Sequence, residues 1–348
     1  MSFDLPKLEN TDINGKAVIV RAELNAPMEN GEVKDPSRLE AVCSTLSLCR
    51  EKGARKIIVL GKLGRPKGGE YEESLSQRIL ATYFSKCLGE EMAFVEYKPY
   101  AQFGEVVDAV KGSDKKFVLL ENVRFWNEEG DNNEEFARQL ASCGEFYIND
   151  AFGVSHRAEA TIVGIPKFLP KAAGVQFVRE VENLSRVLDN PKRPVVTILS
   201  GAKEDKLDYL EDFIRISDRV LVAGLLPTIL GEDYKNDKVV LGRLIQDKED
   251  VTKHTIESFV SEIENAGTIV VSGPLGKFEN EGHRQGTKEV FEAVAAASAF
   301  KVAGGGDTGR AISMLGLSEK FDFVSTGGGA MLQFLAKGTL PGLEALLH

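Results

Sequence analysis

Short apolar runs of four or five residues alternate with longer amphipathic segments over the whole chain. This alternation restricts the fold more than any other feature. A parallel strand is covered by helices on both faces of its sheet, so it appears in a sequence as a continuous apolar run. Such runs separated by helical segments are typical of βα units around a parallel sheet. The sequence therefore predicts an α/β protein.

The apolar runs also suggest how many sheets there are. A chain of 348 residues is about twice the usual domain length. Two sheets are therefore more plausible than one continuous sheet, and we expect a mainly parallel sheet flanked by helices in each of two domains. Helices are expected, for example, at 36–51 and 134–142. The expected strands are 17–20, 56–60, 92–96, 117–120 and 146–148 in the first half, and 195–199, 220–223, 268–271, 300–303 and 321–324 in the second.

A helical stripe near the middle of the chain marks the expected boundary between the domains. Its apolar residues recur at helical spacing up to Asn190 and Pro191, where a helix would end. We expect an interdomain helix over 176–190, between one domain at 1–175 and another at 191–335. The stripe consists of Val178, Val181, Leu184, Val187 and Leu188.

The charge and hydropathy of the chain exclude several classes of partner. The formal net charge is −10, whereas nucleic acid and anionic membranes attract basic surfaces. No segment approaches the roughly 18 apolar residues of a membrane-spanning helix, and the first residues show no apolar signal region. We expect a cytoplasmic protein that binds neither nucleic acid nor membrane.

The cysteines all lie in the first half, without CxxC spacing or a neighbouring histidine pair. In a chain of this size, buried reduced thiols are a better interpretation than a disulfide framework or a zinc site. The residues concerned are Cys43, Cys49, Cys87 and Cys143.

The segment KVAGGGDTGRAI, residues 301–312, follows an expected strand and leads into an expected helix. Its glycines would let an anion approach the N–H groups of a helix start. Asp307 would repel a phosphate unless magnesium lay between them, so a metal–nucleotide complex is indicated. The structural alternative is a strand-to-helix turn capped by Asp307 or Thr308. Three further segments, SGAK at 200–203, SGPLGKFE at 272–279 and STGGGA at 325–330, also follow strands and favour a ligand site.

Cationic side chains follow the expected strands of the first half. Parallel strands end at one edge of a sheet, so these cations would form a basic site for a small, multiply anionic ligand. For any one of them, a surface salt bridge is the alternative. His156 is a better candidate for an anion donor or a structural residue than for a general base, because phosphoryl transfer to an anionic acceptor needs little base catalysis. The set is Arg38, Lys62, Arg65, Arg124, His156 and Arg157.

The order and spacing of the motifs resemble phosphoglycerate kinases along nearly the whole chain. The motifs are VRAELNAP, DPSRLEA, LGRPKG, LLENVRF, YINDAFGVSHRA, SGAK, GPLGKFE, GGGDT, STGGGA and LPGLEAL. The resemblance implies two Rossmann-like domains, with 3-phosphoglycerate on the N-terminal one and magnesium–ATP or magnesium–ADP on the other. It also implies a tail, 336–348, that packs back on the N-terminal domain, and a monomer. The implied reaction transfers the acyl phosphate of 1,3-bisphosphoglycerate to ADP reversibly and in line, with domain closure.

The resemblance assigns roles to residues of this sequence. Asp307 would bind magnesium, Glu279 the ribose, and Lys203 the phosphoryl group during its transfer. The implied catalytic residues are Arg38, Lys203, Gly305 and Gly306. The implied substrate-binding residues are Glu23, Asn25, Arg38, Lys62, Arg65, Arg124 and Arg157, and the implied nucleotide-binding residues are Lys203, Lys206, Glu279, Gly304, Gly305, Gly306, Asp307 and Thr308.

Some positions depart from the family pattern. Glu23 stands for the usual aspartate, Lys62 for the usual histidine, and Ser272 for the usual asparagine; the spacing between the lysines of SGAKEDK is one residue shorter. The segment AGLLP at 223–227 replaces a glycine-rich one. A second hypothesis is therefore a catalytically weak homologue that binds an anion or nucleotide as a regulator. A nicotinamide-dependent oxidoreductase is disfavoured, because the G-x-G-x-x-G fingerprint is missing.

Overall fold

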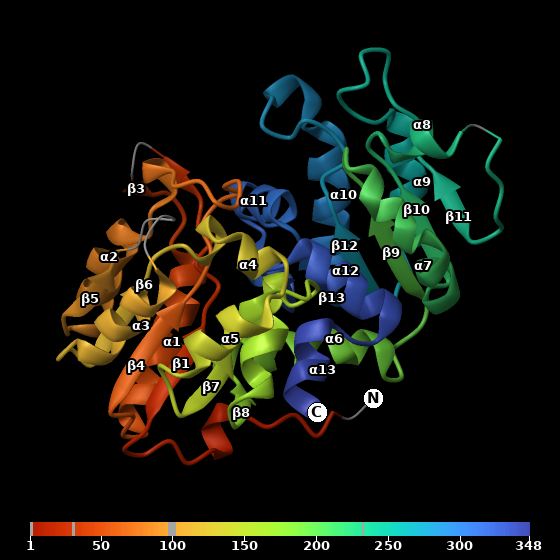
Figure 1. The fold of residues 1–348 in the computed structure, drawn as a ribbon. Helices are drawn as coiled ribbons and strands as arrows, with labels where there is room; N and C mark the ends of the chain where they lie inside the picture. Colours follow the sequence, from red (N-terminus) through yellow and green to blue (C-terminus); the bar gives the residue numbers. More distant parts are fainter. Residues whose placement is uncertain (1–2, 30–31, 97–101, 232) are drawn as a thin grey trace. The chain divides into compact units, whose positions relative to one another are not determined.

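The computed structural model describes residues 3–29, 32–96, 102–231 and 233–348 (Figure 1). The chain divides into two compact units. The N-terminal unit holds the chain up to Val181 together with Leu340–His348, and the C-terminal unit holds Glu182–Thr339. Helix α6 (Val175–Leu188) contains the point of division.

The N-terminal unit is built on a parallel sheet with the strand order β5-β6-β4-β1-β7-β8. The expected strands of the first half are confirmed. The sequence did not reveal β8, because its three residues, Lys-Ala-Ala, are too short and too weakly apolar to form a recognisable run. The strands are β1 (Ala17–Arg21), β4 (Lys56–Leu60), β5 (Met92–Val95), β6 (Phe117–Leu120), β7 (Phe146–Asn149) and β8 (Lys171–Ala173).

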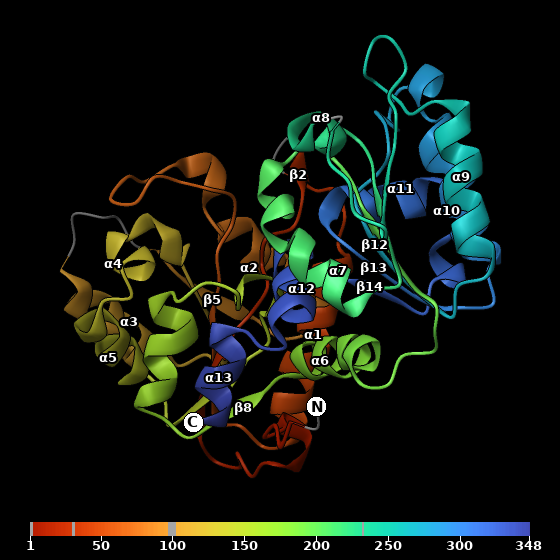
Figure 2. The same ribbon diagram turned by 90° about the vertical axis from the view of Figure 1, so that its right-hand side faces the viewer.

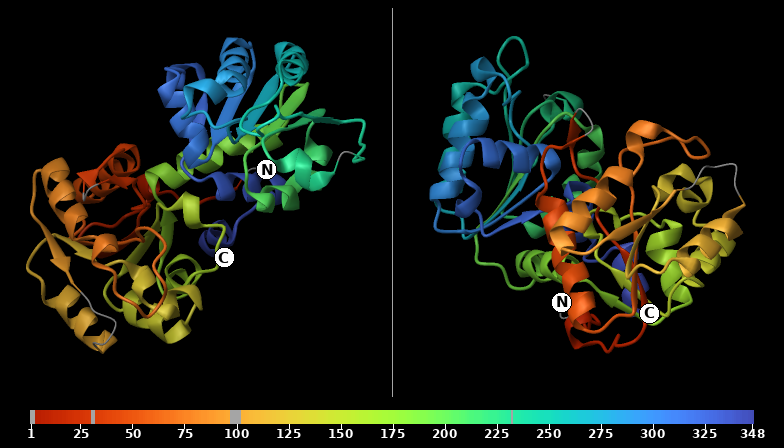
Figure 3. Two further views of the ribbon diagram at one scale, coloured as in Figure 1. Left: turned by 90° about the horizontal axis from the view of Figure 1, so that it is seen from above. Right: turned by 90° about the vertical axis from the view of Figure 1, so that its left-hand side faces the viewer.

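Helices α1 (Ser37–Glu51) and α2 (Arg78–Leu88) pack on one face of this sheet. Leu39, Leu46 and Phe84 from these helices join the strand residues in a fully buried core. Figure 3 shows both helices in red-orange and orange (right-hand view). The other strands and α-helices described in this unit before α6 are a hairpin of β2 (Met28–Glu29) and β3 (Glu32–Val33), and helices α3 (Phe103–Gly112), α4 (Asn127–Gly130) and α5 (Glu134–Ala141).

The same core corrects the expectation for the cysteines. Cys43 on α1 and Cys87 on α2 form a disulfide, so the prediction of four reduced thiols is wrong for this pair. Their 44-residue separation in sequence gave no sign that the two helices lie side by side. Cys49 and Cys143 are free and buried, as expected.

The C-terminal unit repeats the architecture with the parallel strand order β11-β10-β9-β12-β13-β14. The expected strands of the second half are confirmed, and β11 is additional. Helices α9, α10 and α11 contribute buried residues to the core on one face of the sheet (Figure 2). The elements are β9 (Val195–Leu199), α7 (Leu210–Ile216), β10 (Arg219–Val222), α8 (Leu226–Leu230), β11 (Val239–Leu241), α9 (Lys253–Glu264), β12 (Thr268–Ser272), α10 (Gln285–Ala296), β13 (Phe300–Gly304), α11 (Gly306–Met314), β14 (Phe323–Ser325) and α12 (Gly328–Lys337).

The last helix, α13 (Pro341–Leu347), belongs to the N-terminal unit. The Gly342 N–H donates a hydrogen bond of 2.9 Å to the Ser155 carbonyl, and Leu343 and Leu346 are buried. A side chain at Gly342 would lie 2.6 Å from Ser155, so glycine is required for this contact. The chain therefore returns to its first unit after completing the second.

Glycines at the strand ends of the C-terminal unit are required by neighbouring backbone. Gly273 follows β12 with φ 106°, and a Cβ atom there would lie 1.9 Å from the Ser200 carbonyl oxygen at the end of β9. Gly224 follows β10 with φ 63°, and its Cβ would lie 2.6 Å from the backbone of Gly201. Packing of adjacent strand ends therefore accounts for these glycines before any ligand is considered.

This packing predicts different effects for two Gly→Ala substitutions in the C-terminal unit. Gly273→Ala should cost about 2–4 kcal/mol of unfolding free energy, because it combines a positive φ with a steric clash. Gly306→Ala is the control, since nothing lies within 4 Å of a Cβ there and α11 begins at this residue. Urea unfolding followed by circular dichroism measures both. Equal stability of the two variants would contradict this account of Gly273.

Candidate active site

The predicted substrate residues of the N-terminal unit lie beyond the carboxyl ends of adjacent strands. Asn25 follows β1, Lys62 follows β4, Arg124 lies in the 3-10 turn η3 (Val123–Phe125) after β6, and Arg157 follows β7. Because β6, β4, β1 and β7 are consecutive in the sheet, these segments meet at one edge. The sheet thus gathers cations that are far apart in sequence.

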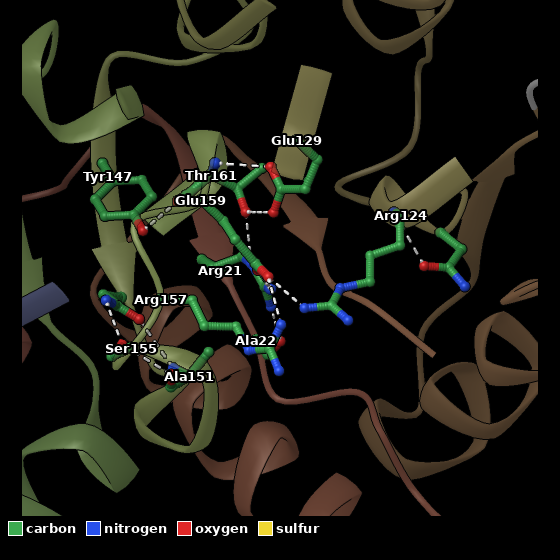
Figure 4. A network of polar contacts seen from close by, with 12 residues as sticks. Arg21, Ala22, Arg124, Glu129, Tyr147, Ala151, Ser155, Arg157, Glu159 and Thr161 are labelled. Carbon is green, nitrogen blue, oxygen red and sulfur yellow. Dashed lines mark hydrogen bonds and ion pairs between the residues drawn. The ribbon is translucent and has the colours of Figure 1, made fainter. Parts of the chain in front are cut away.

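A buried carboxylate, Glu159, lies among the arginines of this edge (Figure 4). Its Oε1 atom accepts a short hydrogen bond from Arg124 Nη2 and lies 4.0 Å from Arg157 Nη1. Its Oε2 atom lies 4.0 Å from Nη2 of Arg21. Arg124 and Arg157 therefore each pair with a carboxylate of the protein, as the alternative to an anion site proposes. The carboxylate is buried, however, so these pairs are not surface salt bridges.

Arg21 is fully buried and organises a second part of the network (Figure 4). Its Nε donates to Thr161 Oγ1 at 2.8 Å, and the Thr161 hydroxyl in turn donates to Glu129 Oε1 at 2.5 Å. The Thr161 N–H donates to Glu129 Oε2 at 2.9 Å, and Tyr147 donates to the Thr161 carbonyl. Burial raises the pKa of Glu129 to about 7, against the opposing attraction of Arg21.

Lys62 and Glu23 lie beside these arginines and are both buried. Burial lowers the pKa of Lys62 to about 8; the Glu23 carboxylate opposes this change, and Arg124 and Arg21 add to it. The amine therefore carries its charge at pH 7 and loses it at moderately alkaline pH. Lysine at this position supplies a positive charge that depends on pH.

Asn25 and Arg38 form a separate pair of contacts. Arg38, in the first turn of α1, donates from Nη1 to the Asn25 carbonyl at 2.6 Å. The Asn25 side-chain oxygen accepts from the Gly64 N–H at 2.9 Å, and so holds the loop that carries Arg65. Arg65 itself is exposed at this loop.

His156 does not add a cation to this group at neutral pH. Burial and then the nearby Arg157 charge lower the pKa of the imidazole below its ordinary value of 6.5. The lowered pKa disfavours a positive charge on His156 at neutral pH. A neutral hydrogen-bonding or structural role remains predicted, as the sequence favoured.

In the C-terminal unit, the two lysines of SGAKEDK differ in their surroundings. Lys203 is exposed and directly precedes a 3-10 helix, η7 (Glu204–Tyr209), so the expected α-helix begins only at α7. Lys206 Nζ donates to the carbonyls of Ser200 at 2.5 Å and Ser272 at 3.1 Å. Burial and the Lys203 charge lower the pKa of Lys206 to about 8. Lys206 thus ties the ends of β9 and β12 together.

The turn GGGDT begins helix α11 without a side-chain cap. Gly305, with φ 110°, is the N-cap, so the alternative of Asp307 or Thr308 as the cap is wrong. The buried Thr308 hydroxyl donates to the Gly304 carbonyl and accepts from the Gly273 N–H, both at 2.9 Å. It therefore joins the ends of β13 and β12. The first N–H groups of the helix have no acceptor within the helix, which suits an anion.

Asp307 and Glu279 share an arginine at the surface of the C-terminal unit. Arg310 Nη1 lies 3.5 Å from Asp307, and Arg310 Nη2 donates to Glu279 at 3.0 Å. All three side chains are more than half exposed. Across the described ranges of the chain, no group of three His, Cys, Asp or Glu side chains could hold a metal ion alone. Asp307 is therefore a single carboxylate, and a cation there would need ligands from a bound molecule.

Sequence reasoning missed several residues that shape these two regions. Arg310 stands in a helical pattern that gave no reason to pair it with Glu279. Glu159 lies 35 residues from Arg124, and Glu129 lies 32 residues from Thr161. Arg21 directly follows the expected strand 17–20, and only this position beside an apolar run could have indicated its burial.

Comparison with known proteins places the chain in a family. The family model for phosphoglycerate kinase matches residues 8–240 and 235–338. Proteins named phosphoglycerate kinase from Finegoldia magna and Moorella thermoacetica are 32% and 34% identical to it, over 97% of this chain and 98% of each relative. The chain belongs to the phosphoglycerate kinase family. It is accordingly a kinase with two parallel-sheet α/β domains. Family membership favours neither a regulatory homologue nor a nicotinamide-dependent oxidoreductase, the two alternatives considered from the sequence.

Solved phosphoglycerate kinase structures share the whole fold. The enzymes from Coxiella burnetii and Pyrococcus horikoshii superpose with TM-scores of 0.80 and 0.83 at 29% and 27% identity, and 98% of each chain is covered. The alignment with the Finegoldia magna protein extends over 389 positions, although this chain has 348 residues, so this chain lacks segments present in that relative.

No helix among the described residues is long and apolar enough to cross a membrane.

The lowered pKa of Lys62 predicts a pH dependence of anion binding in the N-terminal unit. The amine is charged below pH 8, so sulfate, whose own charge is constant above pH 6, should bind about three- to tenfold more weakly at pH 9.5 than at pH 7. Lys62→Arg should show a smaller change over this range, because arginine keeps its charge whereas Lys206, whose pKa is also about 8, titrates in both proteins. Calorimetric titration at several pH values measures both. Identical pH profiles for the two proteins would contradict the prediction.

Proposed function

We propose that this kinase catalyses the reversible transfer of the acyl phosphate of 1,3-bisphosphoglycerate to ADP, which yields 3-phosphoglycerate and ATP. Family membership supports the reaction. The observation that carries the assignment of sites is the contrast between the sheet edges of the two units. One edge gathers buried and half-buried cations, and the other presents glycine turns and a helix start.

The N-terminal unit is proposed to bind 3-phosphoglycerate. This ligand carries a phosphate and a carboxylate, which planar guanidinium groups bind through paired hydrogen bonds. Arg38 and Asn25 contact each other, and Lys62 with Glu23 adjoins Arg124, so the proposed site contains two groups of neighbouring side chains. The proposed substrate-binding residues are Glu23, Asn25, Arg38, Lys62, Arg65, Arg124 and Arg157.

The C-terminal unit is proposed to bind the nucleotide with magnesium. Magnesium accepts one protein carboxylate together with phosphate oxygens, so the exposed Asp307 fits this ion when Arg310 releases it. The bound ion supplies positive charge against the phosphate oxygens. Lys206, Glu279 and residues 304–308 are the other proposed contacts, and the N–H groups of Gly305 and Gly306 at the start of α11 would donate to a phosphate.

Catalysis is proposed to rest on charge neutralisation and alignment. Arg38 and Lys203 would neutralise the phosphoryl group in transit. In the direction that consumes ATP, the carboxylate of 3-phosphoglycerate would attack the γ-phosphorus in line while ADP leaves, without a covalent enzyme intermediate. The proposed ligands belong to different units, so transfer requires a conformation in which they meet. Domain closure with exclusion of water remains our prediction for that step. We also propose a cytoplasmic monomer without nucleic-acid or membrane partners, which the net charge of −10 supports.

A coupled assay tests the proposed reaction directly. Purified protein with 3-phosphoglycerate, ATP and magnesium should turn over at about 1–1000 per second, and chelation of magnesium should abolish the activity. GTP and a reaction without nucleotide provide the comparison. A folded protein without turnover would contradict the proposal and favour the regulatory homologue.

Arg38→Ala separates substrate chemistry from nucleotide binding. We expect transfer to fall by at least about a hundredfold, because a cation aimed at the transferring group is lost. Binding of magnesium–ADP, measured by calorimetry, should stay within a few-fold, since Arg38 belongs to the other unit. The control is Arg50→Ala at the far end of α1, where the side chain donates to the Leu88 carbonyl; its activity should match the parent protein. Loss of both functions in Arg38→Ala would indicate misfolding.

A further inference from the structure

Glu159 places a fixed negative charge inside the proposed anion site. Its side chain is 7% exposed and lies within 4.0 Å of three guanidinium groups, those of Arg21, Arg124 and Arg157. Two of these arginines are proposed ligands of 3-phosphoglycerate. The protein's own carboxylate thus occupies hydrogen-bonding capacity that an anionic substrate would need.

The contacts of this carboxylate are incomplete. Glu159 Oε2 and Arg21 Nη2 are both buried and without a hydrogen-bond partner in the described structure, and they lie 4.0 Å apart. Arg124 uses one nitrogen, Nη2, for Glu159, whereas a guanidinium offers five N–H donors. Arg124 and the exposed Arg157 therefore keep N–H donors that Glu159 does not engage and that can bind a second, external anion, whereas Arg21 is fully buried.

We propose that Glu159 is a specificity-determining residue, an internal competitor that discriminates against ligands with a single anionic group. This inference rests on the proposed function. A tethered carboxylate is always present at high effective concentration, so an anion that reaches only Arg124 and Arg157 gains little by competing with it. A ligand with two anionic groups also engages Arg38 and Arg65, and these contacts compensate for the repulsion by Glu159.

Glu159 could compete with external anions, or it could only hold Arg124 in position. The variant Glu159→Gln distinguishes these two roles. The amide oxygen of glutamine can still accept from Arg124, so positioning alone predicts little change in anion binding. The negative charge is removed, however, so competition predicts tighter binding of any anion. The gain is largest for ligands that depend on Arg124 and Arg157 alone, and selectivity for the two-group substrate falls.

The experiment compares sulfate with 3-phosphoglycerate in the full-length protein. Calorimetry at pH 7 and constant ionic strength should show sulfate binding at least about tenfold tighter in Glu159→Gln, and 3-phosphoglycerate about two- to threefold tighter. In kinetics, KM for 3-phosphoglycerate should fall and inhibition by sulfate should strengthen. Glu145→Gln is the matched control, because Glu145 also pairs with an arginine, Arg55, but is exposed directly before β7, where it accepts from the Ala17 N–H. It should change neither affinity.

The outcomes distinguish this inference from the proposed function. Unchanged or weaker sulfate binding in a Glu159→Gln protein with parent-like urea unfolding would overturn the role of Glu159. Equal gains for sulfate and 3-phosphoglycerate would overturn the claim of discrimination. If the variant unfolds more easily, Glu159→Asp provides the second test: its shorter side chain should loosen the hold on Arg124, so sulfate should bind more tightly than in the parent. Absent turnover with the sulfate effects intact would contradict only the proposed reaction.

Discussion

The buried charge of Arg21 is the constraint on which much of the N-terminal unit depends. A guanidinium keeps its proton, so burial requires nearby acceptors and negative charge. Thr161 accepts a hydrogen bond from Arg21, and the Glu159 carboxylate lies 4.0 Å from it. Thr161 also donates to Glu129, which brings the segment η5 (Ala160–Gly164) and helix α4 against the end of β1. Helix α13 then packs on η5. One buried charged side chain thus connects the end of β1 to the segment after β7, on which the last helix packs.

The sequence predicted the sheets well, because parallel strands covered on both faces appear as continuous apolar runs. The strand ends also located Lys62, Arg124 and Arg157 at one edge. What it could not provide were contacts between residues distant in sequence. Glu159 follows Arg157 closely, yet nothing in the chain indicates that it reaches Arg124. The disulfide between Cys43 and Cys87 and the neutral state of His156 likewise depend on tertiary packing.

The strand ends of the C-terminal unit serve structure and proposed function with the same residues. Thr308 and Lys206 each connect two strand ends by hydrogen bonds to backbone groups. Gly273 gives the room that this close packing needs. Strand ends joined by such hydrogen bonds should change their conformation little when a ligand binds. This preorganisation favours electrostatic stabilisation of a transferring group.

The return of α13 to the N-terminal unit affects how the protein is made. The C-terminal unit is one uninterrupted stretch, Glu182–Thr339, whereas the N-terminal unit needs Leu340–His348 to be complete. During synthesis from the amino end, the unit that begins first therefore finishes last. Its buried leucines, Leu343 and Leu346, leave the ribosome only after every residue of the other unit has been added. The N-terminal fold can therefore be completed only after the whole C-terminal unit, Glu182–Thr339, has been translated.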